Sequence, residues 1–274
     1  QDFLSNMSHE MRSPLNGIKG MLDILKEEPG MEHNGYLDKA NTSVIHLTGL
    51  INDILDMSKI ESGRIELKRE FLLGREIKKN LMAVVAPIAE KKHIELIPSI
   101  GRAPYEGMWC DINRTKQILI NILSNAVKYT EPGGHIWLSN NFEIIEGKTM
   151  KVTYTIKDDG IGMSKEFLEH IYEPFEQMDK SYNRNGTGLG LAITKRLIDS
   201  MGGNIYIDSE LGVGTTVAVQ FIVEGDNISD TDTHETAVSI DIDRIKTATK
   251  GKRVLIAEDN DINRTAIAKL LSNM

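Results

Sequence analysis

The chain has 274 residues, of which 40% are hydrophobic and 26% are charged, and its formal net charge at pH 7 is −8. These proportions exclude disordered and collagen-like classes, and the length predicts two globular domains or slightly more. The negative charge argues against nucleic-acid binding by this chain, because that affinity depends on clustered Lys and Arg that displace counterions.

A single cysteine and the lack of long apolar stretches limit the possible locations. Cys110 has no partner for a disulfide bond and none at zinc-ligand spacing, so it favours a reducing compartment and is predicted to be a small buried residue. No stretch approaches the ~20 apolar residues that a membrane helix needs, and no basic-then-apolar leader is present. Because the chain begins with Gln1, we expect a piece of a longer protein whose other parts hold a sensor and any membrane anchor.

Residues 1–64 predict a helical hairpin. A seven-residue repeat of apolar side chains extends over residues 4–25 and is typical of a bundle-forming helix. After a break at Glu28-Pro29-Gly30, a second pattern of the same kind covers residues 37–58. Two such helices bury little alone, so we expect a homodimer whose hairpins form an all-α four-helix bundle. His9 falls on the face opposite the apolar seam, where a core histidine would not lie.

Residues 65–224 alternate between short strands and helices. The pattern predicts strands at 65–71, 94–100, 135–145, 151–157, 204–209 and 215–223, and helices at 74–91, 111–129 and 189–201. Glu146-Gly147 is a turn that would join two of these strands in a hairpin. We therefore expect an α/β sandwich with one mostly antiparallel sheet.

The end of the chain is predicted to be a linker followed by a fragment of another domain. Residues 224–243 contain seven acidic residues and no Lys or Arg, so we assign residues 225–250 to an acidic linker. Residues 251–274 then begin with a short buried-type strand at 253–257, and a helix starts at Asn263. One strand and one helix are too little for a complete domain.

The first predicted helix carries a histidine beside a carboxylate. An imidazole that attacks phosphorus needs one unprotonated nitrogen, and Glu10 can hold the proton on the other nitrogen of His9. The run SHEMRSPLN at residues 8–16 resembles the phosphoacceptor motif of dimeric histidine kinases. The resemblance implies that His9 accepts a phosphoryl group and that Ser13 positions water or a partner aspartate for phosphatase or transfer steps. The alternative is an ordinary surface patch.

A second run, NILSNAVKYT, starts at Asn121 and resembles the asparagine box of the same family's ATP-binding domain. Asn121, Asn125 and Lys128 fall on one helical face. The amide oxygen of Asn125 is a suitable ligand for Mg²⁺, which usually bridges substrate phosphates. The resemblance implies that Lys128 balances phosphate charge and that Tyr129 flanks the nucleotide. The alternative is that the asparagines of this helix only cap it or face the solvent.

The glycine-rich loops complete the ATP-binding pattern. DDGIGM starts at Asp158, and Gly160 and Gly162 permit close approach of the backbone to a ligand. The resemblance implies that Asp158 accepts a hydrogen bond from the adenine amino group. This motif is weak by itself, because Asp-Gly is a common turn.

Two further runs lie downstream. YEPFEQMD at residues 172–179 resembles the phenylalanine box, and residues 180–185 read as a short nucleotide lid that includes Lys180. A second glycine box then opens a helix whose amides would meet the triphosphate, with the predicted nucleotide contacts Gly186, Thr187, Gly188, Leu189 and Gly190. The spacing G-x-G-x-G excludes the Rossmann fingerprint, and no P-loop lysine follows.

The run RVLIAEDNDIN starts at Arg253 and resembles the first strand and acidic pair of a response-regulator receiver domain. The resemblance implies that Glu258 and Asp259 hold Mg²⁺, although the receiver's own phosphoacceptor aspartate would lie on a later strand. The alternative is an unrelated short βα unit. The remaining histidines show no spacing that indicates a metal site and are expected to be surface or packing residues: His33, His46, His93, His135, His170 and His234.

Taken in order, these motifs resemble a hybrid sensor histidine kinase over nearly the whole chain. The resemblance implies a phosphoacceptor hairpin, an ATP-binding domain of the Bergerat (GHKL) fold and the start of a receiver. It implies an ATP-dependent protein-histidine kinase that uses ATP and Mg²⁺ to phosphorylate His9. A receiver aspartate, in the parent chain or in a separate response regulator, would then accept the phosphoryl group. It also implies the cytoplasmic portion of an inner-membrane sensor.

Two other classes of protein remain open. The first is a degenerate kinase that acts as a scaffold, which is favoured only by Gln177, because some relatives carry an arginine there that assists the γ-phosphate. Lys180 or Arg184 could substitute for that arginine. The second is an ATPase of the related gyrase and chaperone superfamily, which the SHEMRSP hairpin argues against. The sequence leaves open whether phosphorylation within the dimer is in cis or in trans.

Overall fold

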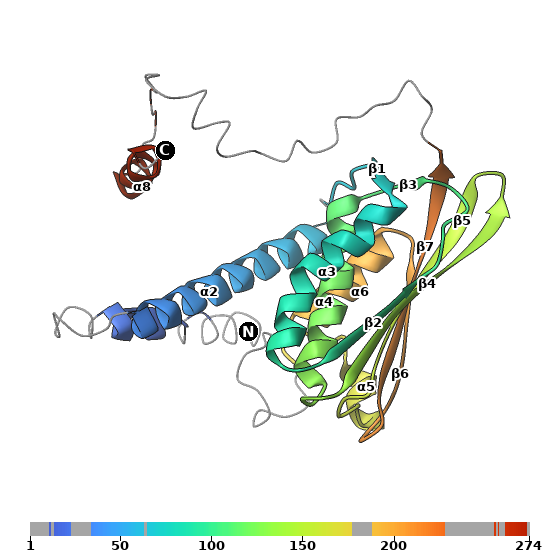
Figure 1. Ribbon diagram of the computed structural model, residues 1–274, viewed down its shortest axis with the longest axis horizontal. Coiled ribbons are helices and arrows are strands. Elements are labelled where there is room, and N and C mark those ends of the chain that lie inside the picture. Colours follow the sequence, from blue (N-terminus) through green and yellow to red (C-terminus); the bar gives the residue numbers. More distant parts are fainter. Residues whose placement is uncertain are drawn as a thin grey trace. The chain divides into compact units, whose positions relative to one another are not determined.

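The computed structural model describes residues 11, 14–22, 34–62, 65–176, 188–227, 255, 257 and 261–272. The chain divides into two compact units, Gln1–Asn227 and Ile228–Met274. The first unit holds all the described strands and every described helix except α8 (Asp261–Ser272), which belongs to the second (Figure 1). The helix predicted from Asn263 onward is thus confirmed.

The N-terminal part of the first unit contains two neighbouring helical segments. Helix α2 (Asn34–Glu61) confirms the predicted second helix, and residues 14–22 are helical as well. A Cβ added to Gly17 would lie 3.4 Å from Ser43 Oγ of α2, so the two segments lie side by side. The predicted break at residues 28–30 lies outside the described residues. Large apolar side chains remain exposed along α2: Leu37, Val44, Ile45, Ile51 and Leu55.

One sheet organises the rest of the first unit. Its strands are β1 (Glu70–Leu73), β2 (Glu95–Ile100), β3 (Gly107–Cys110), β4 (His135–Glu146), β5 (Thr149–Asp158), β6 (Asn204–Glu210) and β7 (Gly214–Asp226). The strand order is β1-β3-β7-β5-β4-β2, and β6 pairs with β7. Only the β2–β4 pairing is parallel among the described strands, so the predicted mostly antiparallel sheet is confirmed.

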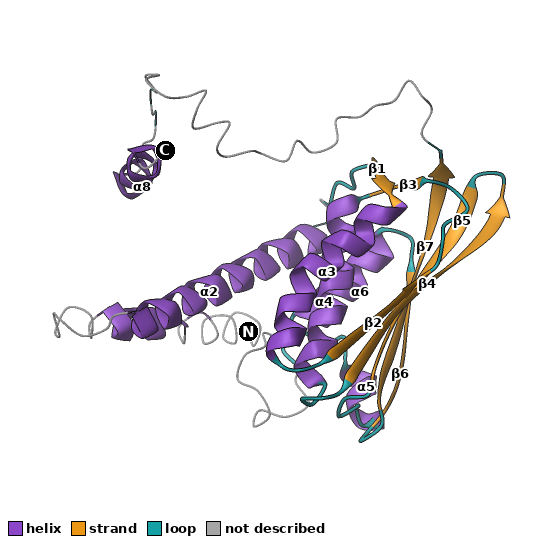
Figure 2. Ribbon diagram, viewed as in Figure 1, coloured by secondary structure: helices purple, strands orange, loops and turns teal. Residues whose placement is uncertain are grey.

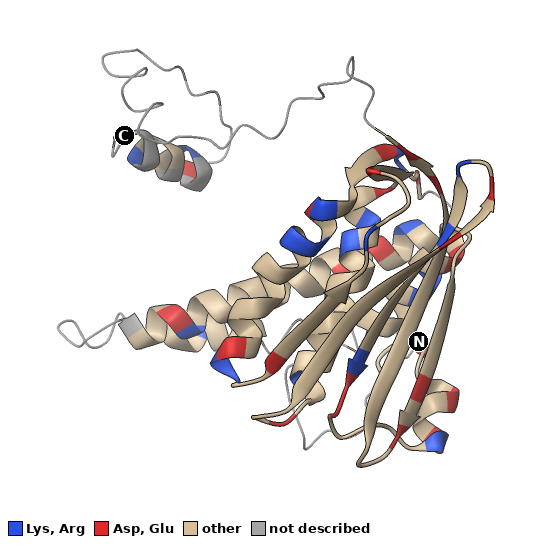
Figure 3. Cartoon of the chain, turned by 45° about the vertical axis from the view of Figure 1, so that its right-hand side comes forward, with Lys and Arg blue, Asp and Glu red and all other residues tan. Residues whose placement is uncertain are grey.

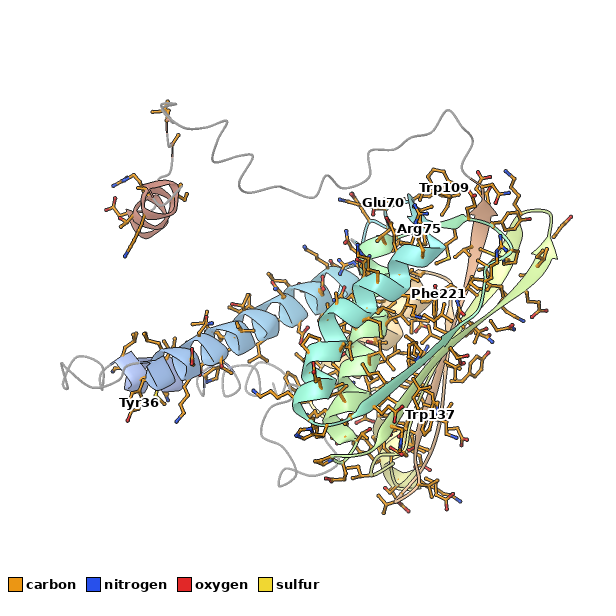
Figure 4. The ribbon with its side chains drawn as sticks, viewed as in Figure 1. Tyr36, Glu70, Arg75, Trp109, Trp137 and Phe221 are labelled. Carbon is orange, nitrogen blue, oxygen red and sulfur yellow. The ribbon has the colours of Figure 1, made fainter. Side chains whose placement is uncertain are left out.

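Three helices cover one face of this sheet: α3 (Gly74–Lys91), α4 (Ile112–Tyr129) and α6 (Gly190–Ser200) (Figure 2). The core lies between them and the sheet. Helix α4 contributes side chains at helical spacing: Ile118, Leu119, Ile122 and Leu123. Each is at most 2% exposed, and burial of a side chain of this size contributes about 1.5–3 kcal/mol. From the sheet, Tyr154 of β5 and Phe221 of β7 belong to the same core (Phe221 is labelled in Figure 4).

The sequence patterns miss two short elements, β3 and α5 (Lys165–His170). Three of the four residues of β3 are buried, so the strand has no alternation that a pattern could detect. Cys110, at its end, is buried as predicted. Helix α5 has six residues, too few for a periodic apolar face, and begins where Ser164 Oγ accepts the Phe167 N–H at 3.2 Å.

Two predicted strands differ from the structure. The strand predicted at residues 65–71 is β1, which begins only at Glu70 because its partner β3 pairs with residues 70–73. Of the strand predicted at 253–257, the described residues Leu255 and Ala257 are not in a strand. Among the described helices, none has the length and apolar composition to cross a membrane.

Candidate functional site

A cavity of about 370 Å³ opens beside the C-terminal half of α4. Its lining brings together eight of the predicted nucleotide contacts: Asn121, Asn125, Lys128, Tyr129, Asp158, Gly162, Gly188 and Gly190. These residues come from α4, from the end of β5 with the loop after it, and from the start of α6. Segments distant in the sequence therefore meet in one site.

Helix α4 is anchored at its start, at its middle and at its end. At the start, Asp111 Oδ1 accepts the Arg114 N–H at 2.9 Å and caps the helix. Further along, Asn121 Nδ2 donates to Thr194 Oγ1 of α6 at 2.6 Å. At the end, Lys92 Nζ donates to the carbonyl oxygens of Val127 and Lys128 at 2.9 and 2.7 Å. Asn125 and Lys128 are thus carried on a helix that cannot shift freely.

Burial lowers the pKa of Lys92, and the carboxylate of Glu131 acts in the opposite direction. Its ammonium group lies at the C-terminus of α4, where a positive charge interacts favourably with the helix dipole. In the last turn of α4, Lys128 Nζ lies 4.9 Å from the centroid of the Tyr129 ring. The two predicted nucleotide contacts are therefore neighbours, with the aromatic face beside the cation.

Asp158 supplies a buried carboxylate at the cavity. It is 7% exposed, and its Oδ1 accepts the Gly160 N–H at 3.0 Å. The Thr215 N–H of β7 donates to the same carboxylate. Burial raises the pKa of Asp158 in spite of these two hydrogen bonds. A carboxylate held in this way has acceptor capacity left for an amino group of a ligand.

The sequence predicts that the glycines of both loops allow close approach of a ligand. The structure shows a different role for some of them. A Cβ on Gly160 would overlap the Tyr129 carbonyl oxygen, and one on Gly162 would overlap the carbonyl oxygen of Glu210. Gly160 and Leu189 are absent from the cavity lining, and Leu189 is fully buried in the core. These loops need glycine because backbone packs against backbone. At Gly190 a Cβ would lie 2.7 Å from Asn121 Oδ1, inside the site itself.

Sequence reasoning missed the apolar wall of the cavity. That wall consists of Met163, Phe167, Ile171, Ile207 and Val217. Met163 is the last residue of the DDGIGM run, but nothing in that run marked its side chain. Phe167 lies on α5, Ile171 follows it, and Val217 lies on the buried face of a strand, so these three had a signal only for burial. Asp53 of α2 and Gln117 of α4 also line the cavity, and no motif marked them.

Several predicted site residues lie outside the described residues. They are His9, Glu10, Ser13, Lys180, Gly186, Thr187, Glu258 and Asp259. Gln177 and Arg184 lie outside them as well. Within the described part of the chain, no group of three or more His, Cys, Asp and Glu side chains could hold a metal ion. Of the predicted metal ligands, only Asn125 lies in the described part of the chain, and its role as a Mg²⁺ ligand at the cavity stays a prediction.

Lys and Arg are interspersed with Asp and Glu along the described part of the first unit (Figure 3).

A site with a buried aspartate, an asparagine-bearing helix and two glycine loops, all on one face of a mostly antiparallel sheet, defines a class of protein. It is the class of ATP-binding domains found in histidine kinases, gyrases and chaperones.

Comparison with known proteins agrees with this class. Residues 110–225 match the family described as histidine kinase-, DNA gyrase B-, and HSP90-like ATPase. Residues 1–63 match the His Kinase A (phospho-acceptor) domain. The second match decides between the members of the class, because it places a phosphoacceptor domain before the ATPase domain. The chain therefore contains the phosphoacceptor and ATP-binding domains of the histidine kinase family.

Individual relatives support the assignment. The sensor histidine kinase GacS of Pseudomonas protegens is 40% identical over 217 residues, which are 78% of this chain and 24% of the relative. The autoinducer 2 sensor kinase/phosphatase LuxQ of Vibrio parahaemolyticus is 35% identical over 270 residues, 96% of this chain and 30% of the relative. The chain therefore spans less than a third of the length of these two relatives.

Among solved structures, the crystal structure of full-length ShkA in complex with AMPPNP is similar, with a TM-score of 0.60 and 29% identity. The match covers 82% of this chain and 46% of ShkA.

Proposed function

We propose that this chain is the catalytic core of a hybrid sensor histidine kinase that phosphorylates itself on His9. One observation carries the proposal. Asn125, Lys128 and Asp158 converge on one cavity, in a chain whose residues 1–63 match a phosphoacceptor domain. The cavity volume of about 370 Å³ suits a small-molecule ligand, and its mostly apolar wall with a few polar groups is typical of such sites.

The residues at the cavity fit an adenine nucleotide. The buried carboxylate of Asp158 would accept a hydrogen bond from the amino group of the base, and Met163 and Ile171 would contact its faces. Lys128 would lie near the phosphates. Asn125 would hold Mg²⁺, which supplies charge neutralisation at the β- and γ-phosphates when bound. The AMPPNP bound to ShkA supports an ATP-type ligand for the related domain here.

The reaction is an in-line phosphoryl transfer. A nitrogen of His9 attacks the γ-phosphorus, an N–P bond forms, and the bond from phosphorus to the β–γ bridging oxygen breaks, so that ADP leaves. Glu10 would hold the proton on the other ring nitrogen and keep the attacking nitrogen free. The protein contributes positioning and charge stabilisation rather than a covalent step of its own.

The proposal includes two partners. The exposed apolar side chains of α2, such as Val44 and Leu55, favour a second copy of the hairpin in a four-helix bundle. A receiver domain would take the phosphoryl group from His9, with Ser13 assisting transfer or hydrolysis and with Glu258 and Asp259 at the Mg²⁺ site of the receiver fragment. The predicted cytoplasmic location of this portion stays a prediction.

The test is incubation with γ-labelled ATP and Mg²⁺, followed by treatment with acid and with alkali. We expect label that acid removes and alkali does not, and we expect its loss in His9→Ala and in Asn125→Ala. His170→Ala and Asn113→Ala are matched controls, because both side chains are exposed and neither lines the cavity. If the protein is a dimer and binds ATP but takes up no label, the result would instead favour the degenerate scaffold.

A further inference from the structure

The loop that carries Asp158 is fixed by a residue outside the cavity. Strands β4 and β5 pair antiparallel, with Ile136 opposite Asp158. His135 and Asp159 therefore face each other just beyond the last paired residues. Neither side chain lines the cavity. Any effect of this pair on a nucleotide must therefore be indirect, through the loop that carries Asp158.

Three contacts join His135 to Asp159. The backbone N–H of His135 donates to Asp159 Oδ1 at 2.7 Å. The His135 ring nitrogen Nδ1 lies 2.8 Å from Asp159 Oδ2. In return, the Asp159 N–H donates to the His135 carbonyl oxygen at 3.3 Å. Both carboxylate oxygens and the backbone of Asp159 are thus held by one residue.

The rest of the loop is held in the same way. Gly160 N–H bonds Asp158 Oδ1, and the Ile161 N–H donates to the Tyr129 carbonyl oxygen at 3.1 Å. Each residue from Asp158 to Ile161 therefore has a fixed hydrogen bond. Rotation of the Asp158 carboxylate would break its hydrogen bond from the Gly160 N–H. That N–H belongs to the peptide that follows Asp159, and the contacts with His135 fix the position of Asp159.

Glu95 of β2 and Trp137 of β4 contact the ring of His135. Its Nε2 lies 3.8 Å from Glu95 Oε2 of β2. The ring stacks on Trp137, with centroids 5.6 Å apart and an interplanar angle of 24° (Trp137 is labelled in Figure 4). Lys157 Nζ lies 5.6 Å from the centroid of the same Trp137 ring. The imidazole thus lies between two carboxylates and rests on an aromatic face.

The charge state of Asp159 supports this arrangement. Its partial burial acts to raise the pKa, but the hydrogen bonds from the backbone and ring of His135 outweigh burial, and the pKa of Asp159 is lowered. The carboxylate is therefore ionised at neutral pH, as an acceptor of two hydrogen bonds should be.

We propose that His135 is a positioning residue for nucleotide selection: through Asp159 it holds the Asp158 carboxylate in the orientation that accepts an amino group of adenine and repels the carbonyl oxygen of guanine. The inference rests on the proposed role of Asp158 in the function above. A hydrogen-bond acceptor with a fixed direction discriminates between a donor and an acceptor at the same position of the base, whereas a freely rotating acceptor discriminates less.

The test compares ATP with GTP for the intact chain, His135→Ala, His135→Asn and Asp158→Asn. Dissociation constants are measured by displacement of a fluorescent ATP analogue, and KM and kcat by autophosphorylation. We expect His135→Ala to raise the Kd and KM for ATP about tenfold and to lower the preference for ATP over GTP by a similar factor, with kcat within about twofold. In His135→Asn the side-chain amide can donate to Asp159, so most of the preference should return.

His170→Ala is the matched control, because His170 forms a similar contact with Glu173, 2.7 Å from Nδ1 to Oε1, at an exposed position. An unchanged ATP preference in His135→Ala, or equal losses for both nucleotides together with a lower melting temperature in His135→Asn, would overturn the inference. If Asp158→Asn weakens ATP binding and His135→Ala does not, only this inference fails. If Asp158→Asn has no effect, the proposed role of Asp158 fails, and the inference with it.

Discussion

Asp56 of α2 and Arg114 of α4 form an ion pair, with 3.0 Å between Oδ2 and Nη1. The side chains are only 15% and 22% exposed, respectively. Gln117 joins them, because its Nε2 donates to the same oxygen of Asp56 at 2.8 Å and its Oε1 accepts from Arg114 at 2.7 Å. Met57, which follows Asp56 in α2, is buried in the core of the ATP-binding domain. Helix α2 is therefore joined to α4 and to the core beneath the sheet by a small polar network beside an apolar anchor.

This network predicts measurable coupling between Asp56 and Arg114. In a double-mutant cycle with Asp56→Ala and Arg114→Ala, we expect a coupling free energy of about 1–3 kcal/mol in urea unfolding, because the pair is largely shielded from water. The exposed pair Lys195–Asp199 on α6 is the control, with side chains 36% and 51% exposed. There we expect about 0.5 kcal/mol or less. Equal coupling in the two cycles would contradict the prediction.

Substitution by alanine is expected to cost much more free energy of unfolding at Gly162 than at Gly147. Both have a positive φ, +63° and +55°, so alanine is strained by about 1–2 kcal/mol at either position. A Cβ on Gly147 meets no atom within 4 Å, whereas on Gly162 it would overlap the carbonyl oxygen of Glu210. We expect Gly162→Ala to lose about 3 kcal/mol or more in urea unfolding and to weaken ATP binding. Gly147→Ala should bind ATP normally, and equal losses in the two variants would disprove this account.

Cys110 predicts a loss of stability in alkali. Burial raises the pKa of its thiol from 9.0 to about 11. A raised folded-state pKa means that the contribution to stability is complete below about pH 9 and is lost as the pH rises through about 11. The expected loss between those limits is at most about 3 kcal/mol. The measurement is the free energy of unfolding at pH 8 and pH 11 in the intact chain and in Cys110→Ala.

The alanine variant lacks the thiol and should lose less stability over that interval. Other groups that titrate in alkali contribute equally to both proteins and cancel in the difference. The exception is the buried Tyr154, whose pKa is raised by burial and also by the charge of the Cys110 thiolate, so its effect counts with that of the thiol. Identical pH profiles for the two proteins would show that the thiol makes no contribution.

The contacts of Lys92, which lies between α3 and β2, predict that this residue stabilises the end of α4. Lys92→Met keeps the apolar stem but removes the two hydrogen bonds to carbonyl oxygens of α4, so we expect a loss of about 1–2 kcal/mol. Amide hydrogen exchange in the last turn of α4, next to Lys128 and Tyr129, should accelerate. Lys91→Met is the control, since Lys91 is exposed. If the two variants exchange alike, the last turn of α4 is held by other contacts.

Periodic apolar patterns were sufficient to predict most of the fold. The helices 74–91 and 111–129 and the long strands around Glu146-Gly147 were predicted almost to the residue, because a core on one side imposes a period of 3.6 or 2 on long segments. The short elements β3 and α5 escaped, since four or six residues are too few to show a period. The pairing of β3 between β1 and β7 is a long-range choice that no local pattern contains.

The sequence by itself determined which polar residues to expect in the cavity, because Asn125, Lys128 and Asp158 lie in motifs with a fixed order and spacing. Only the tertiary structure decided which neighbours these residues have. It brought Asp53 and Gln117 to the cavity, packed Gly160 and Gly162 against backbone, and placed His135 on Asp159. Local spacing fixes which residues share a turn or a helical face, but strand register and helix docking are set by burial over the whole chain. Contacts across those elements are therefore invisible until the chain has folded.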